Sequence, residues 1–108
     1  MSSLAKGLEA EADLVGRFQA LAAEWRREVA WTSSITDIAM HPAYQQIIGM
    51  GQAVVPLLLR ELDQRPDHWF WALRAITGVD PVLPEHRGKL SEMAKAWLDW
   101  GRQQGYTW

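Results

Sequence analysis

Between residues 8 and 29 the apolar residues recur at alternating steps of three and four, and this spacing predicts one long amphipathic helix. Its apolar face consists of Leu8, Val15, Phe18, Ala22, Trp25 and Val29, widened by Leu14 and Leu21. Charged residues occupy the opposite face, so the helix is expected to bury one side and expose the other. A coiled-coil dimer is the alternative that the same spacing leaves open.

Two shorter helices are expected after this one. Ser34 followed by Asp37 has the spacing of an N-cap residue and a first-turn acid, which predicts a short helical turn. The proline in His41-Pro42 predicts a second start, because proline is tolerated at the first helical position. That helix is expected to end around Gly49.

The second half of the chain predicts three further helices. The first begins near Val55, beside a proline that its first turn accommodates. The next covers residues 68–77, with Asp67 placed to cap it and Gly78 placed to end it. Because this segment is apolar on nearly every side, we expect it at the centre of the fold. The last helix is expected over about residues 90–104.

Length and composition indicate one globular unit. A chain of 108 residues, 48% hydrophobic and 22% charged, has the size and balance of one ordinary folded domain. No segment alternates for long enough to predict a strand. We therefore expect an all-α fold, a compact bundle of about five helices forming a single domain over residues 1–108.

One segment carries a family resemblance. In residues 47–62 an apolar-x-x-apolar-Gly step is followed by Val55-Pro56 and by leucines that continue the next helix. This pattern resembles a HEAT-like repeat of the lyase-associated type, and the likeness extends over about residues 47–78. The resemblance implies a HEAT-like helical hairpin at the core and a role in protein binding.

The same segment departs from the repeat pattern. Trp69, Phe70 and Trp71 stand where such repeats carry small residues, and barely one and a half repeats can be traced. A regular solenoid is not expected, because about three repeats are usually needed for stability. Residues 41–77 also resemble small bacterial helical proteins rich in tryptophan.

The residue inventory argues against catalysis. There is no cysteine, and His41, His68 and His86 lack the paired spacing of a helical metal site. No serine lies in a Gly-x-Ser-x-Gly elbow, and no glycine-rich loop has the lysine of a phosphate cradle. We therefore expect no catalytic, cofactor-binding or metal-binding residues, no cofactor and no evident small-molecule substrate; the protein is not expected to be an enzyme.

Charge and hydropathy indicate which partners and which cellular location to expect. The formal net charge of −2 supplies no positive field for a phosphate backbone, which disfavours nucleic acid as a partner. No apolar run approaches the roughly 20 residues that cross a bilayer, and the first residues lack the pattern of a signal peptide. A cytoplasmic protein with no membrane contact is expected.

Seven tryptophans are the compositional anomaly, and large aromatic side chains dominate both cores and interfaces. The leading hypothesis is a non-catalytic protein–protein interaction module, such as an adaptor, an inhibitor or an antitoxin-like small bacterial protein, that binds a partner protein or a second copy of itself. The partner-binding candidates are Trp97, Trp100, Tyr106, Trp108, Phe70 and Trp71. Core packing of these aromatic residues is the competing interpretation.

Two other functions stay open. A nucleic-acid-associated helical protein would need scattered arginines to converge on one face free of carboxylates. Those arginines are Arg17, Arg26, Arg27, Arg60, Arg65 and Arg74. An enzyme would need Asp80, Glu85 or His86 of the 79–89 loop beside a pocket.

Overall fold

The computed structural model describes residues 2–108, with side chains from residue 10 onward; Met1 and the side chain of Leu8 lie outside this part. Helix accounts for 74% of the structure, and residues 2–108 contain no strand, which confirms the all-α class. None of the helices in this range is long and apolar enough to cross a membrane.

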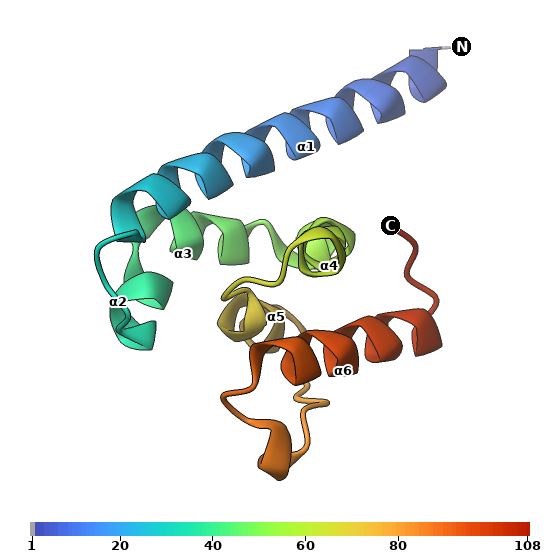
Figure 1. Cartoon of the computed structure of the whole chain (residues 1–108). Coiled ribbons are helices and arrows are strands. Elements are labelled where there is room, and N and C mark those ends of the chain that lie inside the picture. The colour runs from blue at the N-terminus through green and yellow to red at the C-terminus, as the bar shows by residue number, and fades with distance from the viewer. Residues whose placement is uncertain (1) are drawn as a thin grey trace. The chain divides into compact units, whose positions relative to one another are not determined.

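The helices follow one another with short connections (Figure 1). They are α1 (Ser2–Val29), α2 (Ile35–Met40), α3 (Pro42–Gly49), α4 (Val55–Gln64), α5 (Phe70–Thr77) and α6 (Leu90–Gln103), with 3-10 turns η1 (Gly51–Val54) and η2 (Pro84–His86). The backbone falls into two units, residues 1–47 and 48–108. The expectation of a single domain over residues 1–108 stays a prediction.

In the first unit, Trp25 of α1 lies at the centre of the packing. Its indole Nε1 donates a hydrogen bond of 2.9 Å to the carbonyl oxygen of Ile38 in α2. Its ring packs at a tilt against Tyr44 of α3, with 5.4 Å between the ring centroids. Phe18 and Ala22, which the predicted stripe places on the same face of α1, are also fully buried. The apolar stripe is therefore confirmed at Phe18, Ala22 and Trp25, whereas its other members from residue 10 onward are half-buried. The helix α1 begins earlier than the periodicity predicted.

Local capping explains where α2 and α3 begin. The Ser34 hydroxyl accepts a hydrogen bond of 3.3 Å from the backbone N–H of Asp37, as predicted for an N-cap. At the next junction, His41 Nδ1 accepts from the backbone N–H of Ala43 at 3.0 Å, while His41 Nε2 lies 2.9 Å from Glu28 Oε1. Because Nδ1 accepts, the proton of the neutral ring is on Nε2, which donates to the carboxylate.

In the second unit, α4 packs against both α5 and α6 (Figure 1). Its first turn contains a proline, as predicted, and its buried face supplies leucines to the core. The fully buried side chains contributed by α4, α5 and α6 include Leu58, Leu59, Leu73 and Trp97. Burying such side chains contributes about 1.5–3 kcal/mol each, so this leucine and tryptophan cluster stabilises the unit.

The start of α5 differs from the prediction. The helix begins at Phe70, two residues later than expected, and Trp69 occupies the N-cap position without a side-chain capping bond. Asp67 is not that cap, because its carboxylate accepts from the backbone N–H of His68 at 2.8 Å. The end of α5 is as predicted, since Gly78 adopts a left-handed φ of 72° and donates its N–H to the carbonyl oxygen of Arg74.

Candidate partner-binding surface

The segment after α6 turns back along α4. Gly105 has φ 86°, and the N–H of Tyr106 donates a hydrogen bond of 2.9 Å to the carbonyl oxygen of Gly101. This is the bond of a helix-ending glycine motif, in which a left-handed residue reverses the chain. Figure 1 shows the consequence, as the red segment beyond α6 returns toward α4.

Two side-chain hydrogen bonds hold this segment in place. The Tyr106 hydroxyl donates to Gln52 Oε1 at 2.8 Å, and Trp108 Nε1 donates to Asp63 Oδ2 at 2.9 Å. The guanidinium of Arg102 lies over the Trp108 ring, 5.2 Å from its centroid, within the range of a cation–π contact. Residues 106 and 108 are therefore fixed to positions near opposite ends of α4.

A missing side chain makes room for Trp108. A Cβ added at Gly101 would lie 2.7 Å from Leu59 Cδ1 and 3.1 Å from Trp108 Cζ3. No alanine fits there without displacing Leu59, which is fully buried, or the Trp108 ring. Gly101 therefore permits the close approach of α6, α4 and the returning segment.

Aromatic rings form a continuous row from the core to the surface. Trp97 and Trp100 meet edge to face, with 5.3 Å between centroids, and Trp100 and Tyr106 lie 5.7 Å apart with their planes at 33°. Trp97 is fully buried, whereas Trp100, Tyr106 and Trp108 are half-buried. We call Trp100, Tyr106 and Trp108 the aromatic face.

An open pocket adjoins the aromatic face. Its volume is about 290 Å³, and its lining comes from Gln52, Thr77, Val79, Trp100, Gln104 and Tyr106. None of these six side chains is charged. The pocket therefore offers stacking surface and amide groups, and it provides no general base, metal ligand or counter-ion.

Of the six predicted partner-binding residues, the structure brings three together on the aromatic face. Trp97 and Phe70 are buried in the core, which corrects their assignment to a binding surface, because a buried ring cannot reach a partner in this conformation. Trp71 lies on α5 and is 39% exposed, with no ring contact to the aromatic face among the described contacts. For Trp97 and Phe70 the competing interpretation, core packing, is confirmed.

Sequence reasoning missed the most exposed aromatic side chain. Trp31 is 78% exposed just beyond α1, and Ile35 and Met40 of α2 are also exposed. Trp31 lies outside the helical stripe and beside Thr32 and Ser33, and this departure from the pattern was the available signal. These three residues belong to the first unit, whereas the aromatic face belongs to the second.

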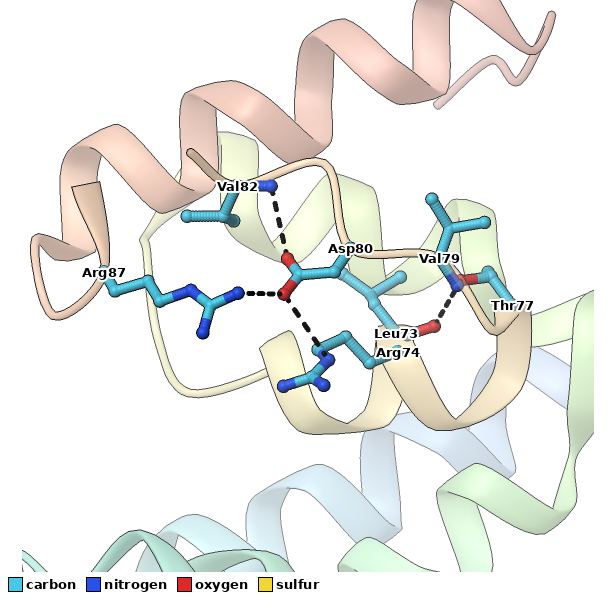
Figure 2. A network of polar contacts seen from close by, with 7 residues as sticks. All are labelled: Leu73, Arg74, Thr77, Val79, Asp80, Val82 and Arg87. Atoms are coloured by element: carbon cyan, nitrogen blue, oxygen red, sulfur yellow. Dashed lines mark hydrogen bonds and ion pairs between the residues drawn. The ribbon is translucent and has the colours of Figure 1, made fainter. Parts of the chain in front are cut away.

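The 79–89 loop is organised around Asp80, as Figure 2 shows. Its Oδ1 accepts from the Val82 N–H at 3.2 Å, while Oδ2 lies 3.4 Å from Arg87 Nη2 and 3.7 Å from Arg74 Nε. At the loop start, the Thr77 hydroxyl donates to the Leu73 carbonyl at 2.7 Å and accepts from the Val79 N–H. Asp80 therefore connects the 79–89 loop to α5 through its ion pair with Arg74.

Carboxylates accompany several of the cationic side chains. Arg27 lies 4.0 Å from Glu28, and Arg74 is paired with Asp80. On α6, the Lys95 ammonium donates a hydrogen bond of 2.7 Å to Asp99, which lowers the pKa of that carboxyl and raises the pKa of Lys95. Two of the arginines proposed for nucleic-acid contact are thus paired, which counts against that alternative.

Among the described residues, no three histidine, aspartate or glutamate side chains lie close enough together to hold a metal ion. A comparison of the chain with protein-family models, with curated proteins and with solved structures found no match.

Proposed function

We propose that this protein is a non-catalytic protein–protein interaction module whose contact surface is the aromatic face. The observation that carries the proposal is the anchoring of half-buried rings by Gln52 and Asp63. Rings that are held in place before binding lose little conformational freedom when a partner covers them. Tyrosine and tryptophan residues of this kind are enriched among the residues that dominate binding energy.

The class of partner follows from the same surface and from the sequence. The HEAT-like resemblance over about residues 47–78 implies protein binding, and this segment supplies Gln52 and Asp63 to the aromatic face. An adaptor, an inhibitor or an antitoxin-like role is therefore proposed, with a partner protein or a second copy of the chain as the bound molecule. The cytoplasm is the proposed location.

Site-specific photo-cross-linking tests the proposal. A benzophenone amino acid is placed at Gln104, which lines the pocket, and in a matched variant at Lys95, an exposed position on α6 outside the lining. The aromatic face predicts an adduct with one protein, or with a second copy, from position 104 and none from position 95. Unlabelled wild-type protein should compete for the adduct, and a folded Trp100→Ala variant should not.

Two results would contradict the proposal. The first is the absence of any protein adduct from position 104. The second is an identical adduct pattern from positions 104 and 95, because that would mean random collision without recognition by the aromatic face.

A further inference from the structure

The two ring nitrogens of His41 contact different groups at the junction between α2 and α3. Nδ1 accepts a hydrogen bond of 3.0 Å from the backbone N–H of Ala43, and Nε2 lies 2.9 Å from Glu28 Oε1 of α1. We propose that His41 is a pH-sensitive cap of α3, which holds the first turn of that helix while the ring is neutral and releases it when the ring is protonated. The inference does not depend on the proposed function, because all these residues belong to the first unit.

The two nitrogens respond differently to a second proton. The neutral ring has one N–H and one lone pair, whereas the protonated ring has an N–H on each nitrogen. The Nε2–H group therefore donates to Glu28 in both states. Protonated Nδ1 has no lone pair for the Ala43 N–H, and the two donors would face each other at 3.0 Å. Turning the ring over does not restore the cap, because a ring carbon then takes the place of Nδ1.

Burial makes the loss of this acceptor important. Ala43 is fully buried and the His41 side chain is only 13% exposed, so water does not reach this N–H while the first turn is closed. A buried N–H without an acceptor is costly, and opening of the turn lets water replace the lost bond. The next residue, Tyr44, is fully buried and packs against Trp25. The opening therefore occurs where α3 joins the core of the first unit.

The rest of α3 does not depend on the ring. The backbone N–H of Gln45 donates a hydrogen bond of 3.0 Å to the carbonyl oxygen of His41, whatever the charge of the imidazole. We therefore expect a local opening at Ala43, with the remaining turns of the helix intact.

The charged groups around the ring permit protonation. Among the described residues, Glu28 is the charged group in contact with His41, and it offers a counter-ion to the protonated ring. Arg27 lies 4.0 Å from the other oxygen of Glu28, Asp37 of α2 is exposed, and α3 contains no charged residue. The cap needs the neutral ring, so it is present at the upper end of the range in which histidines titrate and is lost as the pH falls.

The test is amide hydrogen exchange of the full chain, followed residue by residue in ¹H–¹⁵N spectra at about pH 8 and about pH 5.5. After correction for the intrinsic pH dependence of exchange, the protection of the Ala43 N–H should fall about fivefold or more at the lower pH. The indole N–H of Trp25 should keep its protection, because its bond to the Ile38 carbonyl involves no titratable group.

A matched pair of variants assigns the effect to one histidine. His41→Asn retains a capping oxygen that does not titrate, so the protection of Ala43 should agree within about twofold at the two pH values. His86→Asn removes a histidine of the second unit that also lies near a carboxylate, 4.0 Å from Glu92, and should retain the pH dependence of the wild type.

A fall in the protection of Ala43 that disappears in His41→Asn and persists in His86→Asn supports the inference. Equal protection at the two pH values in the wild type would overturn it, and so would a fall that persists in His41→Asn. The ¹⁵N signals of the wild-type ring at the higher pH give an independent check. A proton on Nδ1 in place of Nε2 would also overturn the inference, because that nitrogen could not accept from Ala43.

Discussion

Trp25 and Ile38 are joined by a hydrogen bond of 2.9 Å, from the indole Nε1 of α1 to the backbone carbonyl oxygen of α2. Because Trp25 is buried, its indole N–H cannot donate to water, and this bond to Ile38 replaces the hydrogen bond that burial removes. One side chain thereby provides both the packing surface and the orientation of α2 against α1. The contact explains why tryptophan, and not a simple hydrocarbon, stands on the buried stripe of α1.

Trp25→Phe should lower the free energy of unfolding by about 2–3 kcal/mol, because it leaves the Ile38 carbonyl without this donor and creates a cavity. Urea denaturation followed by circular dichroism measures the change. The matched control is Trp31→Phe at the 78% exposed position, where a change within about 0.5 kcal/mol is expected. Equal effects at the two positions would show that Trp25 is not a core residue.

Gly101→Ala should destabilise the protein by about 1–3 kcal/mol despite the better helix propensity of alanine, because its Cβ would lie 2.7 Å from buried Leu59. Release of Trp108 should accompany the change and increase its quenching by acrylamide. Gly16→Ala is the control: Gly16 has no neighbour within 4 Å of an added Cβ, so alanine should stabilise α1 by about 0.5–1 kcal/mol. A stabilised Gly101→Ala variant would contradict the close packing of Leu59 and Trp108 against Gly101.

His41→Ala should cost about 0.5–2 kcal/mol of stability, because the Ala43 N–H at the start of α3 loses its acceptor. His41→Asn retains a capping oxygen and should recover most of that loss, although the contact to Glu28 is removed in both variants. Thermal unfolding of the two variants measures the difference. Equal destabilisation by alanine and asparagine would mean that the Glu28 contact, and not the cap, is what His41 contributes.

Asp80→Ala should loosen the 79–89 loop, because it removes the acceptor of the Val82 N–H and the partner of Arg74 and Arg87. Faster hydrogen exchange at Val82 and faster proteolysis of the loop are the expected results. Asp80→Asn retains an acceptor oxygen but loses the ion pairs, which are exposed and contribute roughly 0.2–1 kcal/mol each. Exchange at Val82 in Asp80→Asn should therefore stay near that of the wild type.

The boundaries of most helices could be predicted because local interactions set them. The Ser34 cap acts three residues away, Pro42 is the first residue of α3, and Gly78 ends α5 through its own left-handed φ. Predictions failed where two local signals competed. Asp67 is a good capping residue, yet its carboxylate bonds to the adjacent N–H of His68 and α5 begins later.

The candidate surface was predicted in part. The C-terminal cluster is rich in aromatic residues, and three of its members do form the aromatic face. The helical period places Trp97 on one face of the last helix with Ala94 and Gly101, and all three are buried, but it does not show that Trp100, beside that face, is covered only in part. Nor does it reveal the pocket, because Gln52 and Gln104 lie 52 positions apart.

The sequence by itself therefore determined the all-α class, the Ser34 cap, the end of α5 at Gly78 and the core of the α1 stripe, since each depends on neighbours within a few residues. Tertiary structure alone decided how far Trp100, Tyr106 and Trp108 are covered and which polar groups pair with them. The position of Trp108 illustrates this: its indole bonds to Asp63 of α4, and its ring lies against Gly101, where a side chain would collide with it and with Leu59. Exposure is a property of what packs against a residue, and those neighbours are distant in the chain.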